Sequence, residues 1–373
     1  MSWYFNPSLS VDPRPRSDHH NSGVAIMMGK PRCGKSSIIE CVFQGKKPHE
    51  TAFLQSTTSP ELSNLSSLIN LSSLINLSLL EIPGQFEMFV DDHDRFNLHH
   101  LFSQARSLLY IMDISVGDYY DSAGDLSKVV RFVNHQYPNV KINVLIHKVD
   151  TLPFESHENI RYSMKTLTAC MLYETGLEKL ENIGFYETSI YDSSVHHALS
   201  EIFSSLVPEL PQLQCLLNNF VIKSKLDKVI LCDLKSKLYF ATDSSSVDER
   251  IYRIASEFMD VVIDLDYLIC SNSMEITKSL DENIASINSY LGFEEETTSE
   301  GIKRRERLRS TSKFYPNIQL HLNEVACELC LVGFVSNIDD SLDQGKFNAI
   351  LDYNASIIRN GLRKIFNQRN HKV

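Results

Sequence analysis

The stretch Gly29-Lys30-Pro31-Arg32-Cys33-Gly34-Lys35-Ser36 decides the fold of this chain, because it is a complete G-x-x-x-x-G-K-[ST] phosphate loop. An apolar run over 24–28 predicts a strand before the loop, and residues 37–43 predict a helix after it. The glycines let main-chain N–H groups turn toward phosphate oxygens, at the positive end of the helix. Lys35 would contact the β- and γ-phosphates, and the Ser36 hydroxyl would bind Mg²⁺. The residues predicted to bind phosphates here are Gly29, Pro31, Arg32, Cys33, Gly34, Lys35, Ser36 and Ser37.

A second segment indicates which base the site would bind. The apolar run over 140–147 predicts a buried strand that ends in His147-Lys148-Val149-Asp150. This sequence is similar to the N-K-x-D element of guanine-nucleotide proteins, with His147 in place of the asparagine. The Asp150 carboxylate would accept hydrogen bonds from N1–H and N2–H₂ of guanine. Adenine lacks this pair of donors and would leave the carboxylate unpaired. The stem of Lys148 would lie along the base.

A third segment would hold the metal and the attacking water. Glu81-Ile82-Pro83-Gly84-Gln85 ends an apolar run and occupies the place of a D-x-x-G-Q element. In that element the carboxylate holds Mg²⁺ through water, the glycine N–H contacts the γ-phosphate and the glutamine orients the water. Glu81 is one methylene longer than aspartate. Because Mg²⁺ demands near-ideal octahedral geometry, we expect this change to affect metal affinity or the hydrolysis rate.

A weaker signal lies further along the chain. Residues 185–190 are similar to the S-A-x guanine loop, in which Ser189 would support the loop and the Ile190 N–H would contact guanine O6. The strand candidates that precede these motifs alternate with helical runs. This alternation predicts an α/β domain with a mostly parallel sheet and ligand loops at the carboxyl ends of its strands. The strand candidates are 24–28, 77–82, 107–113, 140–147 and 184–188.

Taken together, the motifs resemble the Rag GTPase family of the C/D type, fungal counterparts included. The residues that carry the resemblance are Arg32 to Ser37, Ile82-Pro83-Gly84-Gln85 and His147-Lys148-Val149-Asp150. The resemblance covers nearly the whole chain, apart from the N-terminal tail and one later loop. It implies that residues 53–57 form the first switch. Thr57, with Thr58 as the second choice, would cap Mg²⁺ and the γ-phosphate.

The resemblance also implies partners and a cellular role. It implies GTP or GDP with Mg²⁺ as cofactors, and a heterodimer with a Rag A/B-type GTPase through the C-terminal domain. It further implies a GTPase-activating protein and a membrane scaffold complex at the lysosome or vacuole. The output would be a signal of amino-acid availability to the target-of-rapamycin (TOR) kinase complex.

Beyond the nucleotide-binding motifs the sequence pattern changes. Pro208-Glu209-Leu210-Pro211 marks a boundary. We therefore predict a mobile tail over 1–22 and two domains, over 23–210 and 211–373. The resemblance implies that the first is a Ras-like GTPase domain and that the second is an α+β roadblock (longin-like) dimerisation domain.

The second domain is predicted to be an antiparallel sheet with helices on one side. Ser246 and Glu249 form a candidate capping box for its central helix. Residues 271–312 are polar and charged, and we expect a mobile loop or surface helix there. The other elements expected are a helix over 212–225, a hairpin over 228–243, a helix over 246–268, strands within 318–337 and a closing helix over 346–366.

Composition limits the possible functions. The net charge of −11 argues against a nucleic-acid-binding surface. Eight scattered cysteines fit a reducing compartment better than a disulfide scaffold. No apolar run approaches the length of a membrane span, and the termini lack lipidation signals. We therefore expect a cytoplasmic protein that reaches a membrane only through partners.

Three other features receive plain interpretations. Cys327 and Cys330 have zinc-like spacing, but they fall in a strand pattern without a second pair and are read as core cysteines. The pairs His99-His100 and His196-His197 are read as solvated or partly buried histidines. The hexapeptide at 65–70 is repeated at 71–76, as a local duplication or a longer hairpin.

The motifs allow more than one mechanism. Gln85 is the candidate that orients water, and the bulk of Pro31 and Arg32 would crowd it, so slow intrinsic hydrolysis is expected. A nucleotide-locked scaffold with negligible turnover is the alternative, favoured by Glu81 and opposed by Gln85. An ATP-dependent kinase or ATPase is a third possibility, against which Asp150 predicts a preference for GTP.

Overall fold

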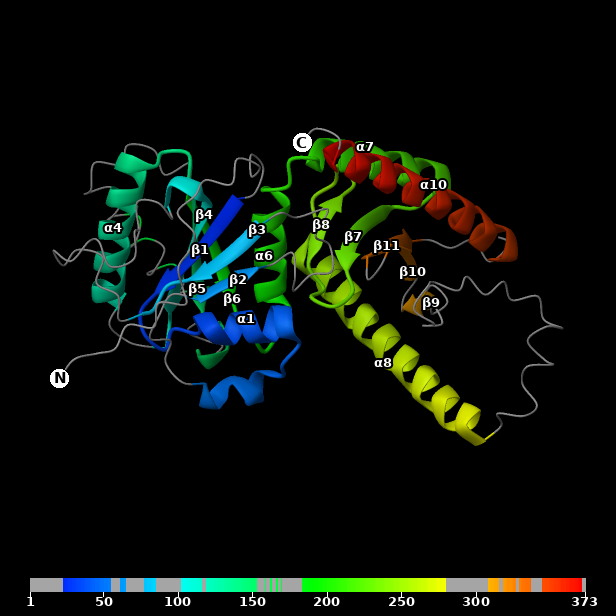
Figure 1. Cartoon of the computed structure of the whole chain (residues 1–373), viewed down its shortest axis with the longest axis horizontal. Helices are drawn as coiled ribbons and strands as arrows, with labels where there is room; N and C mark the ends of the chain where they lie inside the picture. The colour runs from blue at the N-terminus through cyan, green and yellow to red at the C-terminus, as the bar shows by residue number, and fades with distance from the viewer. Residues whose placement is uncertain are drawn as a thin grey trace.

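The computed structural model of the chain describes residues 23–54, 61–64, 77–84, 102–115, 119–152, 183–279, 308–314, 318–326, 329–336 and 344–370, with residues 158, 162, 166 and 169. Several predicted features lie outside these residues: the tail 1–22, the duplicated segment, His99-His100 and Cys327, as well as Thr57, Thr58 and Gln85. The described elements form two sheets with helices packed on them (Figure 1).

The first sheet has six described strands in the order β2-β3-β1-β4-β5-β6. All neighbouring pairs are parallel except β2 with β3. The predicted mostly parallel sheet is therefore confirmed, and the carboxyl ends of its parallel strands share one edge. The strands are β1 (Gly23–Gly29), β2 (Glu61–Asn64), β3 (Leu77–Glu81), β4 (Ala105–Asp113), β5 (Lys141–His147) and β6 (Ile183–Thr188).

Helices cover both faces of this sheet, because its central strands are apolar on both sides. Helices α1 (Lys35–Gln44) and α6 (Ser194–Ser204) pack on one face. Helix α4 (Tyr119–Gln136) packs on the other and lies at the far left in Figure 1. Two short 3₁₀ helices, η1 (Pro48–Phe53) and η2 (Val149–Thr151), follow α1 and β5.

The second sheet is antiparallel, with its described strands in the order β8-β7-β11-β10-β9. The predicted hairpin forms from β7 and β8, with Lys235-Ser236 in its turn. Cys330 is fully buried in β11, as predicted for a core cysteine. The strands are β7 (Lys228–Asp233), β8 (Tyr239–Thr242), β9 (Arg309–Phe314), β10 (Ile318–Ala326) and β11 (Leu329–Ser336).

The prediction that helices cover one side of this sheet is wrong. Helices α7 (Leu210–Ser224) and α10 (Gln344–Asn370) pack on one face, and α8 (Glu249–Ser279) packs on the other (Figure 1). The reason is visible in β7, all of whose residues are buried. Val229 and Leu231 join the core under α7 and α10, whereas Ile230 and Cys232 join the core under α8.

Two details of α8 also differ from the sequence predictions. The helix begins after Asp248, whose Oδ1 accepts the N–H of Arg250, and Ser246 instead offers its carbonyl to Lys228 Nζ. The helix continues to Ser279 because no glycine or proline interrupts it. Strand β9 begins at Arg309, so both ends of the segment expected to be a mobile loop, 271–279 and 309–312, are regular structure.

The two sheets share one hydrophobic core. It runs from Ile38 and Leu145 in the first sheet and its helices to Leu217 and Phe240 in the second part of the chain. Helix α6 lies between the two sheets (Figure 1), and its Ser200 Oγ accepts the N–H of Tyr239 in β8. Among the described helices, none combines the length and apolar character needed to cross a bilayer.

Candidate nucleotide-binding site

The phosphate-loop motif forms the turn between β1 and α1. Its fourth and sixth residues have positive φ, +63° at Arg32 and +105° at Gly34. A Cβ on Gly34 would lie 2.7 Å from the His147 ring, so the position has both the conformation and the close contact that require glycine. The turn leads into α1, which begins at Lys35. The main-chain N–H groups of the first helical turn have no acceptor within the helix and are available to a ligand in the loop.

Lys35 places a charge inside the loop. Its side chain is buried, and Nζ donates to the carbonyls of Gly29 at 2.9 Å and Lys30 at 3.0 Å. These contacts hold the ammonium group within the curl of the loop, where phosphate oxygens would meet it.

The pair expected at the metal site is in direct contact. Ser36 Oγ donates to Glu81 Oε1 at 2.6 Å, and Glu81 is buried at the end of β3. A hydroxyl and a carboxylate are the oxygen ligands that Mg²⁺ prefers, so the residues present fit the metal that the motifs imply.

The chain after β3 approaches the phosphate loop closely. A Cβ on Gly84 would lie 2.3 Å from the nitrogen of Pro31 and 2.6 Å from the carbonyl carbon of Lys30. No side chain fits in this space, which explains the glycine of the predicted switch element. The segment that would sense the γ-phosphate therefore touches the loop that would bind it.

The other end of the site is built around Lys148, which has a φ of +64°. Its Nζ donates to the carbonyl of Arg32 at 2.9 Å and to Asp113 Oδ2 at 2.5 Å. Asp113 ends β4, and its Oδ1 accepts the N–H and hydroxyl of Ser115. Lys148 thereby ties the loop after β5 to the phosphate loop, with Asp113 as its counter-ion.

Asp150 follows in η2, and Ser189 Oγ donates to its Oδ1 at 2.5 Å. The Ser189 hydroxyl also accepts the N–H of Tyr191 at 3.0 Å. Ser189 thus contacts both the Asp150 carboxylate, which the sequence did not predict, and the loop that it was predicted to support.

His147 lies between the two ends. The residue is buried, its Nδ1 lies 3.0 Å from Thr188 Oγ1 and its ring faces Gly34. Burial, with the nearby charge of Lys148, lowers the pKa of His147 to about 4. The imidazole is therefore neutral at pH 7 and acts as a rigid support under the phosphate loop.

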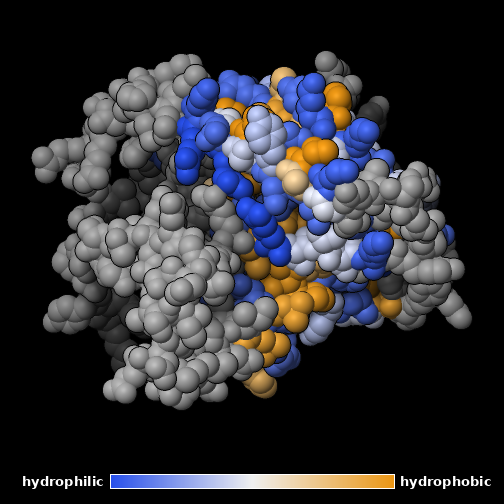
Figure 2. Space-filling view, turned by 90° about the vertical axis from the view of Figure 1, so that its right-hand side faces the viewer, coloured by the Kyte–Doolittle hydropathy of each residue, from blue (hydrophilic) through white to orange (hydrophobic). Residues whose placement is uncertain are grey.

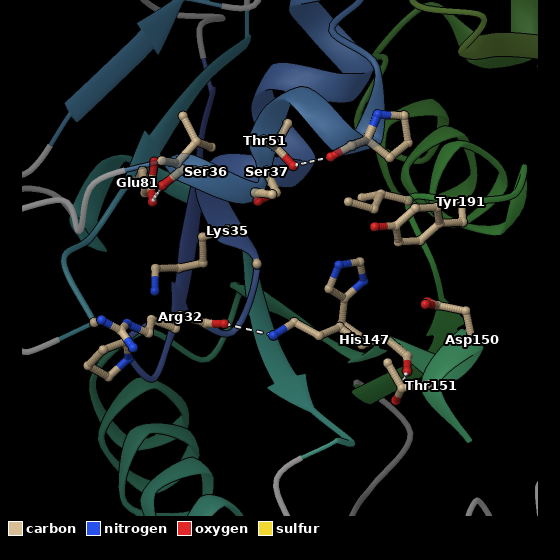
Figure 3. Close-up of a pocket in the computed structure, with 18 residues that line it drawn as sticks. Arg32, Lys35, Ser36, Ser37, Thr51, Glu81, His147, Asp150, Thr151 and Tyr191 are labelled. Atoms are coloured by element: carbon tan, nitrogen blue, oxygen red, sulfur yellow. Dashed lines mark hydrogen bonds between the residues drawn. The ribbon is translucent and has the colours of Figure 1, made fainter. Parts of the chain in front are cut away.

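These residues surround one cavity of about 620 Å³, a volume typical of small-molecule sites. In Figure 3, Lys35, Ser36 and Glu81 lie on one side of the cavity, and Asp150, Thr151 and Tyr191 lie on the other. The cavity therefore has Lys35 and the candidate metal ligands on one side and the Asp150 carboxylate on the other (Figure 3).

Comparison with known proteins agrees with this arrangement. The sequence profile for the Gtr1/RagA G protein conserved region matches residues 25–273. The chain belongs to the Gtr1/RagA family of G proteins.

Its relatives include proteins of the GTR2 and Ras-related C/D type. The chain is 32% identical to GTP-binding protein GTR2 of Saccharomyces cerevisiae over 93% of each protein. It is 38% identical to GTP-binding protein gtr2 of Schizosaccharomyces pombe over 64% of this chain and 73% of that protein. It is 35% identical to Ras-related GTP-binding protein C of Homo sapiens over 64% of this chain and 58% of that protein.

The structure brings most of the predicted site residues of this G protein to the cavity wall. Among the described residues, Gly29, the first residue of the loop, does not line the cavity, and Ser189 contacts Asp150 without lining the cavity. The predicted residues that line the cavity are Pro31, Arg32, Gly34, Lys35, Ser36, Ser37, Glu81, Gly84, His147, Lys148, Asp150 and Ile190.

Cys33, another residue of the predicted phosphate loop, turns its side chain away from the cavity. Its side chain is 2% exposed, packs in the core under the loop and does not line the cavity. Burial raises the pKa of the thiol, so the group stays neutral. The turn at Arg32 and Gly34 directs the intervening residue inward, which leaves only its main chain for phosphate binding.

Sequence reasoning missed one wall of the cavity. Thr51 and Ala52 of η1 line it next to Leu54 of the predicted first switch, and Tyr191, which follows the predicted guanine loop, lines it as well. The Thr51 hydroxyl donates to the carbonyl of Pro48, which fixes this short helix. Tyr191 could have been found as an aromatic residue adjoining the guanine-loop motif. The η1 residues carry no signal beyond their position before the predicted switch.

Proposed function

We propose that this protein is a guanine-nucleotide-dependent switch that binds GTP or GDP with Mg²⁺ and hydrolyses GTP slowly. The observation that carries the proposal is the single cavity that joins Lys35, Ser36 and Glu81 to Asp150. Phosphates would lie within the loop, and Ser36 with Glu81 would hold the metal that neutralises their charge. The base would lie at the other end, against Asp150.

The specificity for guanine follows from Asp150. Ser189 orients one carboxylate oxygen, and the group lines the cavity where the N1–H and N2–H₂ donors of guanine would meet it. Replacement by asparagine supplies a donor where guanine also has a donor, and this change favours xanthine. We expect Asp150→Asn to prefer xanthosine triphosphate over GTP, measured by competition against a fluorescent nucleotide, with ATP as the second competitor. Displacement by ATP as effective as by GTP from the wild-type chain would contradict the proposal.

Slow hydrolysis is proposed from the crowded phosphate loop. Pro31 and Arg32 occupy the cavity edge nearest the predicted switch, and Gly84 already touches the Lys30–Pro31 peptide. Little space remains for a side chain from a GTPase-activating protein unless the loop moves. Single-turnover hydrolysis by the purified chain should therefore be slow and accelerated by a partner. Unaided turnover of tens per second would reject the idea.

The scaffold alternative keeps a specific observation in its favour, the direct Ser36–Glu81 contact at the metal site. A chain locked to its nucleotide would show negligible turnover even with an activating partner. Glu81→Asp would then raise turnover by restoring the shorter carboxylate. Unchanged turnover in that variant, together with acceleration of the wild type by a partner, would exclude the alternative.

We further propose a heterodimer with a Rag A/B-type GTPase, formed by the second sheet. Strand β9 is one of its two described edge strands, with β8 at the other edge, and α8 presents an exposed apolar row, Val261, Leu265 and Leu268, each more than half exposed. Figure 2 views this end of the molecule and shows hydrophobic residues in orange between bands of hydrophilic ones. An edge strand in a domain that also carries an exposed apolar helix row suits sheet extension with a like domain.

The dimer is tested by placing a charge on α8. Leu265→Asp should abolish co-purification with a Rag A/B-type GTPase on a sizing column. The matched control is Ile222→Asp on α7, which is 70% exposed on the opposite layer and should pair normally. Equal pairing by both variants would place the interface elsewhere.

The cellular role is proposed on the same basis. The pair would be held at the lysosomal or vacuolar membrane by a scaffold complex and would report amino-acid availability to the TOR kinase complex. A fluorescently tagged Leu265→Asp chain should leave the vacuolar rim while the Ile222→Asp chain remains. If both tagged chains stay at the vacuolar rim, recruitment to the membrane does not depend on pairing.

A further inference from the structure

We propose that Glu81 ligates Mg²⁺ directly, in place of one of its waters, rather than holding the metal through a water. The inference rests on the proposed function, because it concerns the metal of the nucleotide complex. It differs from the arrangement expected of a D-x-x-G-Q element, in which the carboxylate stays one water away.

The backbone at both ends of the Ser36–Glu81 contact is fixed. Glu81 is paired with Met27 of β1 on one side and with Glu61 of β2 on the other. The next N–H, of Ile82, donates to the Met27 carbonyl at 2.9 Å. Ser36 is the second residue of α1. Since sheet and helix hold the two main chains, the extra methylene of glutamate moves the carboxylate and not the strand.

The observed separation is slightly shorter than that of two ligands of one metal ion. Ser36 Oγ and Glu81 Oε1 are 2.6 Å apart. Two oxygens at right angles on an octahedral Mg²⁺ lie about 2.9 Å apart, given Mg–O distances of about 2.0–2.1 Å. A small opening of the pair would therefore admit the ion with both oxygens bound.

An aspartate at this position would not reach as far. Its carboxylate would stand back by about one carbon–carbon bond, roughly 1.5 Å. A shorter side chain would leave the carboxylate oxygen about 3.6 Å from the metal, too far for a direct bond and close to the distance of about 4 Å at which a carboxylate binds through water. The other described carboxylate lining the cavity, Asp150, lies at the base end (Figure 3), so Glu81 is the group placed to bind the ion.

A direct carboxylate has two measurable consequences. It removes one water from the first shell of the metal, and it adds a negative ligand that slows loss of the ion. Both can be measured with Mn²⁺, which accepts the same oxygen ligands and is paramagnetic. GDP is the nucleotide to use, because the metal shell then needs no ligand from the γ-phosphate or the first switch.

The test counts the waters on Mn²⁺ in the GDP-loaded full chain, by broadening of its electron paramagnetic resonance lines in ¹⁷O-enriched water. Wild type should hold one water fewer than Glu81→Asp and should release Mn²⁺ at least fivefold more slowly. Glu40→Asp on α1, which makes the same one-methylene change at a carboxylate paired with Lys46, should match wild type. Equal water counts in wild type and Glu81→Asp would overturn the inference.

A second measurement needs only the wild-type chain, so the inference can be tested even if Glu81→Asp does not fold. With ¹³C at the carboxyl carbon of glutamate, electron–nuclear double resonance should detect a carbon about 3 Å from Mn²⁺ if the oxygen is bound directly. A nearest carbon beyond about 4 Å would overturn the inference and leave the proposed function standing. Failure of the chain to bind Mn²⁺ and GDP at all would instead reject the proposed function.

Discussion

Each of the two sheets buries one histidine in the same local setting, yet the two residues serve different purposes. His147 in β5 stands opposite Thr188 of β6, and His321 in β10 stands opposite Thr311 of β9. In both pairs the imidazole Nδ1 lies about 3 Å from the threonine hydroxyl, 3.0 Å in the first and 3.1 Å in the second. Both side chains are at least 97% buried, at 1% and 3% exposure.

The difference lies in where each histidine sits along its strand. His147 is the last residue of a parallel strand, at the edge where the ligand loops gather, and its ring supports Gly34. His321 lies inside an antiparallel strand, and its ring packs edge-on against Phe347 of α10, with ring centres 5.2 Å apart. The same hydrogen bond thus supports a binding loop in one sheet and core packing in the other.

Alanine at each position gives the sharpest test of this comparison. His147→Ala should release a fluorescent GDP analogue 10- to 100-fold faster, because the phosphate loop loses its support. His321→Ala should lower the free energy of unfolding by about 2–4 kcal/mol through the cavity it leaves, without changing nucleotide release. Urea titrations and stopped-flow release on both variants check the pair. Equal effects on release would mean that the position in the strand does not matter.

Acidification should test what the two histidines share. Burial lowers the pKa of each to about 4, below the unfolded value of about 6.5. Between these values the unfolded chain binds more protons, so stability is complete above pH 6.5 and falls as the pH drops toward 4. At pH 5 each histidine should cost about 2 kcal/mol of unfolding free energy. In urea titrations from pH 7 to 5, His147→Asn and His321→Gln should each remove part of this loss. If the unfolding free energy of both variants falls with pH as steeply as that of the wild type, the two histidines do not cause the loss.

A smaller effect is expected at Asp113, which adjoins the ligand edge but does not line the cavity. Its side chain is 10% exposed and pairs with Lys148, which in turn holds the Arg32 carbonyl. Asp113→Asn should release GDP about tenfold faster, since it weakens a charge-assisted contact worth about 1.5–3 kcal/mol. Asp125→Asn, which alters an exposed pair with Lys30 and Lys128, is the control and should change release less than about twofold.

The smallest effect is expected at Arg32, whose φ of +63° suits glycine. Arg32→Gly should raise the free energy of unfolding by about 0.5–1 kcal/mol, because relief of the left-handed conformation slightly exceeds the added entropy of the unfolded chain. Arg32→Ala keeps the strain and should bring no gain. Thermal unfolding of both variants without nucleotide measures the difference, and an equal gain from alanine would place the effect in the side chain.

Prediction from the sequence succeeded where the signal is local. The phosphate loop between a strand and a helix, the parallel sheet and the β7–β8 hairpin all followed from short motifs and apolar runs. Prediction from the sequence failed for the second sheet, where both faces of a strand are apolar. The helices on both faces of the second sheet required knowing that α8 packs against Ile230 and Cys232.

The sequence by itself therefore determined the chemistry available at the nucleotide site, because glycine geometry, strand periodicity and the residue types of each motif act within a few positions of the chain. Only the tertiary structure decided how these groups meet. Lys148 contacts Arg32 across 116 residues, Glu81 contacts Ser36 across 45 and Asp113 contacts Lys148 across 35. Local patterns fix which face of an element is buried, but packing and sheet register choose its partner, and these contacts set the shape of the site.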